Sequence, residues 1–547
     1  MKTSARLSSA SDSLKGYAAG RTQRINRRDS KHAQDVLTTA IRSARAGSAV
    51  LVMCVTLGLC LLHLPYPFSF DQALFMAAAR DLSEGAHMYG AFWDLKQPGI
   101  YWWNELAGWL FGFDSLGIRL MDTCWSVAVA LLLWLLLRSR SSLIAALGPM
   151  FALASFYAVA EPWMLSQVEW LVGAPLAALM WCLCNEGNGE PSSVARYGLA
   201  GIMLAGVLLL KLILIPVAGL MLLIALAQDH WVRQRSWASI IKRQIAPATV
   251  GFLVLLAPVL LYMQAVGTLG TAVWTTFVDP GEVLREYPHH KVHMLFSSLR
   301  WFLRTVWYLV PWAAWGAYTG LRQGSRLVWM LAAWISVGFA AVAIQVLSYW
   351  PYHFDLFYIP VGMLAAIGVG DAWTWATARQ APSLRWAIAG ALIVCLAMGL
   401  ALPLSRKTHG VAVAHAFPID RHDLLAATRE FGGPKELVEA AAAVRGLTHD
   451  GDRIVSWGDA RMYFLTGRRP LVEIDGGTSY LTSQLATVAE VILKQRPALI
   501  FISKYRDPDV TYHGGGLIPR TVEENYTRYF ENEAGVWYRP RHAETGT

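Results

Sequence analysis

The chain has 547 residues, of which 55% are hydrophobic and only 16% are charged. Soluble domains carry about a quarter charged residues, so this composition excludes an ordinary soluble enzyme and indicates repeated membrane crossing. The formal net charge of +9 does not indicate nucleic-acid binding, because Lys and Arg gather in short loops and in the N-terminal stretch, and no nucleic-acid motif is present.

The chain begins with a polar, basic stretch, residues 1–47, which we interpret as a disordered cytoplasmic tail. It is too long and too polar for a cleaved signal peptide, so the first span, 48–66, should remain as an anchor. Apolar runs that could cross a bilayer as helices follow at 119–137, 143–160, 165–184, 197–210, 211–227, 247–266, 302–320, 327–348, 354–376 and 385–404. We therefore predict a polytopic helical membrane protein with about eleven spans.

The stretch Arg196–Gln228 is too long for one span and short for two. If it forms two short helices that turn at Lys211, the basic residues that follow all fall on the cytoplasmic side, as the positive-inside rule requires. This topology leaves four pieces on the outer face: loop 67–118, the link near Glu161, loop 267–301 and the chain after residue 404.

The composition changes sharply in the last part of the chain. ELVEAAAAVRGL and SQLATVAEVILKQR read as helices, DRIVSWG and PALIFISK as strands, and YTRYFENEAGVWYRP as a hairpin that turns at Asn532–Gly535. We therefore predict three parts: the tail 1–47, a transmembrane catalytic domain 48–404, and an extracytoplasmic α/β domain 405–547.

Loop 67–118 begins with a carboxylate at a predicted helix start. Ser69 and Gln72 have capping-box spacing, so a helix should begin at Phe70, and Gly85 should end it. Asp71 then lies in the first turn, where the helix dipole favours a carboxylate. An apolar stripe on this helix would hold it flat on the membrane surface: Phe70, Leu74, Ala78 and Leu82. The residues alone leave open whether Asp71 is catalytic or only a helix-start carboxylate.

Further charges stand near the outer face. Asp94 and Lys96 are two residues apart in the first loop, Arg119 opens the second span, and Glu169 and Lys211 lie at or within later apolar runs. Unpaired charges in such places tend to be functional, although a lysine near a helix end can also snorkel to the headgroups. Cations beside a carboxylate would supply a base for an acceptor and positive charge for a departing phosphate.

These residues resemble the GT-C superfamily of membrane glycosyltransferases, in the bacterial branch similar to protein O-mannosyltransferases and to the lipid A aminoarabinose transferase. The first outer loop of that family carries an Asp-Glu pair, a Gly, a Tyr, an aromatic-Asp-x-Lys-x-Pro run and then an Arg. The matching positions here are Asp71-Gln72, Gly85, Tyr89, Trp93–Pro98 and Arg119. Later segments that resemble the family are Gln167–Glu169, Leu210-Lys211, Tyr352-His353, Trp457-Gly458, Tyr463 and Thr466–Arg468.

The resemblance implies a GT-C fold and an inverting transfer of a sugar from polyprenyl phosphate to an acceptor hydroxyl. The reaction would take place on the outer face of the bacterial cytoplasmic membrane, in cell-envelope synthesis, with a glycan, a glycolipid or a protein as acceptor. Asp71 would be the catalytic base, and Asp94 would orient Lys96 or the acceptor. The donor phosphate would bind Lys96, Arg119 and Lys211, and the substrates would contact Tyr89, Glu169, Tyr352 and His353.

The family's Glu after the catalytic Asp is Gln72 here. Some related enzymes use a divalent metal beside acidic residues, so this departure leads us to expect no metal requirement and no other cofactor. Three histidines, His289, His290 and His293, lie near Asp279 and Glu282, a spacing that can bind a metal but is more often a solvated loop.

Two other functions stay open. A transporter or flippase for lipid-linked sugars should show inverted repeats and charges at the midplane, whereas this sequence shows no repeat and places its charges at one face. An O-antigen ligase-like transferase is the second alternative, and its long outer loop with a histidine is not evident here.

Overall fold

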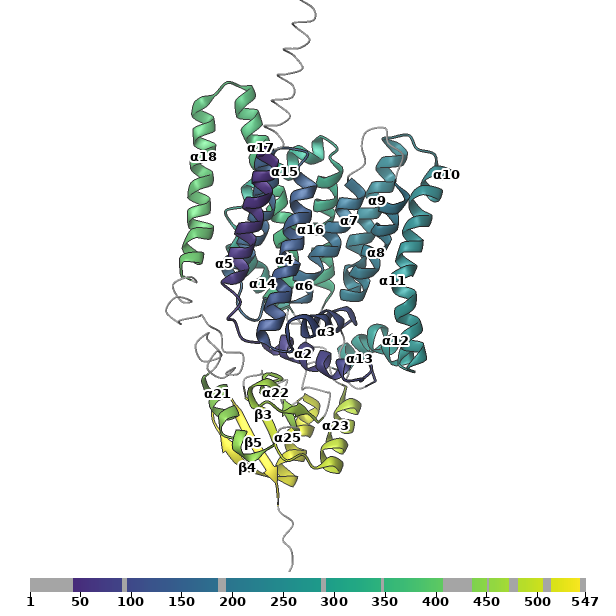
Figure 1. Ribbon diagram of the computed structural model, residues 1–547, viewed down its shortest axis with the longest axis vertical. Coiled ribbons are helices and arrows are strands. Elements are labelled where there is room, and N and C mark those ends of the chain that lie inside the picture. Colours follow the sequence, from purple (N-terminus) through teal and green to yellow (C-terminus); the bar gives the residue numbers. More distant parts are fainter. Residues whose placement is uncertain are drawn as a thin grey trace, which may run out of the picture.

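The structure is a computed structural model that describes residues 43–90, 96–184, 193–286, 292–345, 349–406, 435–449, 452–471, 481–504 and 513–541. A bundle of long helices forms most of it, and a small sheet with its own helices lies beyond one end of the bundle (Figure 1). Asp94, His289 and His290 fall outside the described residues.

Within the described residues, eight helical segments are long and apolar enough to cross a membrane. They are Ser43–Leu61, α4 (Ser115–Leu137), α5 (Ser142–Val159), η1 with α9 (Leu212–Leu214, Ile215–Trp231), α10 with η2 and α11 (Trp237–Ile240, Ile241–Ile245, Ala246–Ala265), α16 (Arg326–Ile344), η3 with α17 (Pro351–Phe357, Tyr358–Ala378) and Pro382–Arg406, which contains α18 (Pro382–Leu396) and η4 (Ala397–Ala401). Shorter apolar helices are α6 with α7 (Val168–Leu171, Gly173–Cys184) and α8 (Val194–Leu210), and a further helix is α15 (Val310–Arg322). The predicted polytopic helical fold is confirmed.

Three predicted boundaries can be compared directly with the helices. The turn at Lys211 is confirmed, because α8 ends at Leu210 and α9 begins at Ile215. The first helix starts at Ser43, before the predicted residue 48. The predicted span 302–320 is wrong: its first residues belong to a separate helix, α14 (Val292–Val306), and α15 begins only at Val310. Pro311 lies in the first turn of α15, where its missing N–H costs no helical hydrogen bond.

The predicted outer loops are largely helical. Four helices lie across the end of the bundle: α2 (Phe70–Ser83), α3 (Gly99–Phe111), α12 (Leu269–Phe277) and α13 (Asp279–Glu286) (Figure 1). The predicted start of α2 at Phe70 is confirmed, and Gly85 follows its end with a φ of +101°, which favours glycine.

That α2 lies on the membrane through Phe70, Leu74, Ala78 and Leu82 stays a prediction: Ala78 is buried, and the other three side chains are partly exposed. The buried residues of α2 are Gln72, Ala73, Phe75, Met76, Ala77, Ala78 and Ala79. The helix packs against α3 and against the C-terminal helix α22.

The C-terminal region contains a mixed sheet with strand order β2-β1-β3-β5-β4, in which β1 is parallel to β2 and β3, and β5 is antiparallel to β3 and β4. Its elements are α21 (Lys435–Ala442), η5 (Arg445–Leu447), β1 (Arg453–Trp457), α22 (Arg461–Thr466), β2 (Arg469–Pro470), α23 (Thr482–Gln495), β3 (Ile500–Ser503), α25 (His513–Asn525), β4 (Tyr526–Glu531) and β5 (Gly535–Pro540). The predicted helices, strands and hairpin are confirmed.

This region docks on the outer helices at two places. At the first, the rings of Phe68 and Phe464 are 4.6 Å apart, and Arg469 forms an ion pair with Glu84 just after α2. At the second, the backbone N–H of Thr482 donates to a carboxylate oxygen of Glu286 at 3.1 Å. The C-terminal region therefore holds both α2 and α13.

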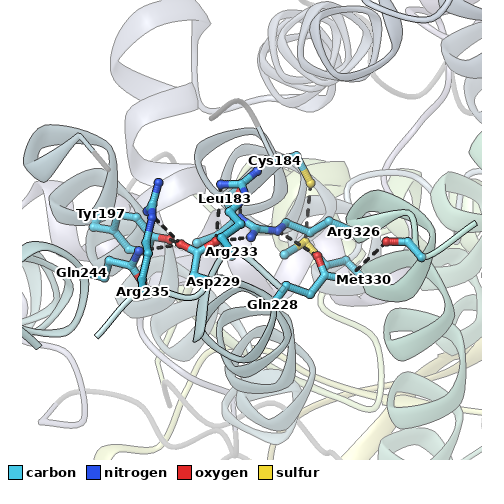
Figure 2. Close-up of polar contacts among 11 residues, drawn as sticks. Leu183, Cys184, Tyr197, Gln228, Asp229, Arg233, Arg235, Gln244, Arg326 and Met330 are labelled. Atoms are coloured by element: carbon cyan, nitrogen blue, oxygen red, sulfur yellow. Dashed lines mark hydrogen bonds and ion pairs between the residues drawn. The ribbon is translucent and has the colours of Figure 1, made fainter. Parts of the chain in front are cut away.

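A buried ionic cluster fixes the opposite end of the bundle. Asp229, at the end of α9, is fully buried and lies among Arg233, Arg235, Gln244 and Arg326 (Figure 2). Its carboxylate accepts from Arg235 at 3.0 Å and from Gln244 at 2.5 Å, and it pairs with Arg326 of α16. Because this many donors offset the cost of burying the carboxylate, the cluster stabilises the packing of α9 against α16.

Candidate active site

Asp71 lies at the end of the bundle nearest the C-terminal region, in the first turn of α2, and is partly exposed (Figure 1). Its Oδ2 accepts a hydrogen bond from Nε2 of Gln167 at 3.4 Å. Gln167 immediately precedes α6, and its side chain is held in turn by the carbonyl of Trp163 at 2.9 Å. Two segments that are far apart in the sequence thus meet at this carboxylate.

Gln72 and Arg119 form the support behind Asp71. Nε2 of Gln72 donates to the carbonyl oxygens of Pro162, at 2.7 Å, and Leu165, while its Oε1 accepts from Nη2 of Arg119 at 2.7 Å. Arg119 is only 2% exposed and also donates to the carbonyl oxygens of Tyr66 and Pro67 and to Ser166. The guanidinium therefore fixes the chain on both sides of the site, which favours a positioning role over the predicted contact with phosphate.

Lys96 lies on the same side of α2 as Asp71. Its ammonium group is 4.9 Å from the centre of the Phe75 ring, and Phe75 follows Asp71 by one helical turn. Residues four apart share a helix face, so Lys96 packs on the face of α2 that also carries Asp71. The hydroxyl of Tyr89 donates to the carbonyl oxygen of Lys96 at 2.9 Å. Tyr89 itself is buried and has a φ of +60°, a conformation that surrounding contacts must hold.

A second charged group adjoins Lys96. Lys211 forms an ion pair with Glu169, and Nε2 of His353 lies 3.6 Å from the same carboxylate. Oε1 of Gln97 accepts from the backbone N–H of Leu212 at 3.3 Å, which ties the residue after Lys96 to the residue after Lys211. The charges of Glu169, Lys211 and Lys96 all act on His353, so the four groups form one electrostatic unit.

The structure thus brings together most of the predicted site residues. Asp71, Lys96, Glu169, Lys211 and His353 converge, and Tyr352 contacts the imidazole of His353 edge-on at 4.7 Å. Two residues differ from their predicted setting: Arg119 lies behind the site, and Lys211 is paired with a buried carboxylate. Asp94 is not among the described residues.

Sequence reasoning missed Asp355. This residue is 1% exposed in η3, two positions after His353, and in the described part of the chain neither carboxylate oxygen has a hydrogen-bond partner. The charge of Glu169 acts on it. A lone acidic residue inside the apolar stretch PYHFDLFYIP was the signal that could have found it, because such residues are expensive in a membrane helix.

The charged residues between α2 and the C-terminal region shift one another's pKa values. The hydrogen bond from Arg469 lowers the pKa of Glu84, whereas burial raises the pKa of Asp81 and lowers that of Arg80. Arg80 lies 5.4 Å from the centre of the Phe464 ring. These groups secure the second half of α2, which leaves its first turn at the site.

Among the described residues, no three His, Cys, Asp or Glu side chains are arranged to hold a metal ion. The amide of Gln72 has both its nitrogen and its oxygen engaged by the chain, so position 72 offers no carboxylate to a cation. The absence of a metal requirement stays a prediction.

The fold and the site define a multi-pass membrane protein with a carboxylate–lysine site at one end of its bundle. No known protein family and no curated protein matches the sequence. Among solved structures, ArnT from Cupriavidus metallidurans bound to undecaprenyl phosphate is similar over 92% of this chain and 98% of its own, at 16% identity and a TM-score of 0.60. The same protein in the apo state gives 15% identity and a TM-score of 0.60.

The arabinofuranosyltransferase AftD from Mycobacteria is similar over 90% of this chain and 40% of its own, at 14% identity and a TM-score of 0.44. The two ArnT structures show that this chain shares their fold.

Proposed function

We propose that the chain is a membrane glycosyltransferase that moves a sugar from a polyprenyl-phosphate donor to an acceptor hydroxyl. The observation that carries the proposal is the position of Asp71, partly exposed in the first turn of α2 at one end of an apolar bundle, with Lys96 packed on the ring of Phe75 one turn further along the helix. The GT-C fold agrees with it, because the solved ArnT structure holds undecaprenyl phosphate.

In the proposed reaction, the acceptor oxygen forms a bond to the anomeric carbon as the bond from that carbon to the phosphate oxygen breaks. Asp71 takes the acceptor proton, and polyprenyl phosphate leaves with the electron pair, so the configuration inverts. The phosphate is a good leaving group whose charge needs cations rather than a general acid. Lys96 supplies such a charge next to the base.

The remaining site residues have distinct proposed roles. Lys211 and Glu169 form an ion pair whose cation faces the donor phosphate when the lipid is bound, and His353 and Tyr352 contact the substrates. Arg119 and Tyr89 position the residues of the first loop through their contacts to carbonyl oxygens. We propose that Asp94 orients Lys96 or the acceptor.

The proposed setting is the outer face of a bacterial cytoplasmic membrane, with the N-terminus in the cytoplasm and residues 405–547 outside as a separate domain. The basic residues of the Asp229 cluster lie at the end of the bundle away from the site, as the positive-inside rule requires of the cytoplasmic end. The acceptor would be a glycan, a glycolipid or a protein of the cell envelope.

The test compares Asp71→Asn with Asp81→Asn, a carboxylate in the same helix that is not part of the proposed site. Purified full-length protein is titrated with undecaprenyl phosphate by native mass spectrometry, and envelope glycans and lipids are compared by mass in cells with each variant. Asp71→Asn should lose transfer and keep lipid binding, whereas Asp81→Asn should keep both. Wild-type glycan masses with Asp71→Asn would rule out this base.

The same experiment separates the alternatives. A flippase would move lipid-linked sugar without forming a new glycosidic bond, so purified protein incubated with a polyprenyl-phosphate-sugar donor and an acceptor would release no polyprenyl phosphate. An O-antigen ligase-like enzyme would add a polymer, and the product would show a series of masses instead of one sugar. Because Gln72 offers no carboxylate to a cation, we expect that transfer needs no metal and that treatment with EDTA leaves it unchanged.

A further inference from the structure

Helix α14 carries a groove on its exposed side. The groove has a volume of about 370 Å³ and is lined by Phe296, Leu299, Arg300, Leu303, Arg304 and Trp307. Phe296 is 62% exposed and Trp307 is 51% exposed. These residues recur at intervals of three and four, so they form one continuous face of the helix.

The opposite side of α14 is packed into the protein. Leu295, Ser298, Phe302 and Val306 are buried, and the hydroxyl of Ser298 donates to the carbonyl oxygen of Tyr349 at 2.6 Å. The ring of Phe302 contacts those of residues in η3 and α17. Because η3 carries His353, this side of α14 supports the candidate site.

The groove combines apolar walls with two positive charges. Arg300 and Arg304 are one helical turn apart, both are exposed, and neither forms an ion pair or hydrogen bond with another described residue. Two like charges at this spacing repel each other. A single phosphate between the two guanidinium groups would remove that repulsion and accept from both.

The groove lies at the outer end of the bundle and away from Asp71. Trp301 contacts the ring of Trp163 at 6.0 Å, and the carbonyl of Trp163 accepts from Gln167, the residue that reaches Asp71. Trp301 follows Arg300 by about 100° around the helix, on the flank away from Phe296 and Leu303. The groove therefore faces the surrounding bilayer, where a lipid of the outer leaflet would meet it.

We propose that α14 holds one anionic phospholipid of the bilayer. Its phosphate lies between Arg300 and Arg304, and one acyl chain lies along Phe296, Leu303 and Trp307. The groove is a site separate from the donor site, and the bound lipid presses α14 onto η3. The proposal does not depend on the transfer reaction.

The experiment titrates delipidated full-length protein with phosphatidylglycerol, and separately with phosphatidylcholine of the same chains, by native mass spectrometry. The first phosphatidylglycerol should bind at least about tenfold more tightly, equal to about 1.4 kcal/mol. Arg300→Gln with Arg304→Gln should abolish this preference. The matched control, Arg322→Gln with Arg379→Gln, removes two arginines that contact aromatic rings elsewhere and should keep it.

A conservative pair, Arg300→Lys with Arg304→Lys, guards against loss of folding, since it keeps the charges and should retain part of the preference. Equal binding of the two phospholipids by the wild type would overturn the proposal, as would an unchanged preference in the glutamine variant. Displacement of phosphatidylglycerol by equimolar undecaprenyl phosphate would assign the groove to the donor and overturn it as well.

Discussion

The support behind the proposed base can be tested at Gln72. This fully buried side chain makes four hydrogen bonds, to the carbonyl oxygens of Pro162 and Leu165 and from the N–H groups of Ser69 and Arg119. Gln72→Leu has a similar size and removes all four. At about 1 kcal/mol net for each bond, the variant should weaken the local structure by about 4 kcal/mol.

The appropriate measurement is hydrogen exchange of the peptide that covers residues 66–85, because it reports local opening instead of global unfolding. A loss of about 4 kcal/mol corresponds to roughly a thousandfold faster exchange where reclosing is fast and the rate follows the opening equilibrium. The peptide that contains β3 should be unchanged and serves as the internal control. Equal exchange of residues 66–85 in wild type and variant would refute the reasoning.

A second variant, Gln72→Glu, separates the two halves of the network. A glutamate at position 72 still accepts hydrogen bonds from Ser69 and Arg119, and its negative charge makes the second one an ion pair. It cannot donate to the carbonyl oxygens of Pro162 and Leu165. Its exchange should therefore lie between those of wild type and Gln72→Leu. Slower exchange in Gln72→Glu than in the wild type would show that the ion pair with Arg119 stabilises the segment more than the two lost hydrogen bonds do. The bonds to the carbonyl oxygens would then not explain why a glutamine stands at position 72.

Three further predictions follow from the contacts. Glu169→Gln and Lys211→Met should each destabilise the protein by about 3–5 kcal/mol, because each leaves a buried charge without its partner. In thermal unfolding, the double variant should lose less stability than the sum of the two single variants, and additive losses would contradict the pairing. Burial and Glu282 raise the pKa of Asp279 to about 6, so its contribution to stability falls as pH rises from about 4 to 6, by at most about 3 kcal/mol. Asp279→Asn should therefore flatten the dependence of the melting temperature on pH between about pH 4 and 6, and an unchanged pH profile would be evidence against the raised value. A Cβ at Gly99 would lie 2.6 Å from the carbonyl oxygen of Leu209. Gly99→Ala should therefore move Lys96 away from Lys211 and weaken the binding of undecaprenyl phosphate about tenfold. The control Gly446→Ala, which has open space around the added Cβ, should bind the lipid like the wild type.

Local sequence determined the secondary structure and the membrane class of this protein. The spacing of Ser69 and Gln72 predicted the start of α2, the charge distribution predicted the turn at Lys211, and alternating patterns predicted the C-terminal hairpin. Each of these signals depends on residues close together in the chain or on the cost of placing charge in a bilayer. Motif spacing also selected the candidate site residues, whose roles stay predictions.

Only the tertiary structure decided which partner each of these charges has. Glu169 and Lys211 are 42 positions apart, and Gln167 and Asp71 are 96 apart, so no local pattern could show that they meet. Arg119 was expected at the phosphate but lies buried among carbonyl oxygens, and α2 packs against α22 of the distant C-terminal region. The physical reason is that a buried charge or carbonyl takes whichever partner the packed helices bring within hydrogen-bond distance, and the packing of distant segments sets that choice.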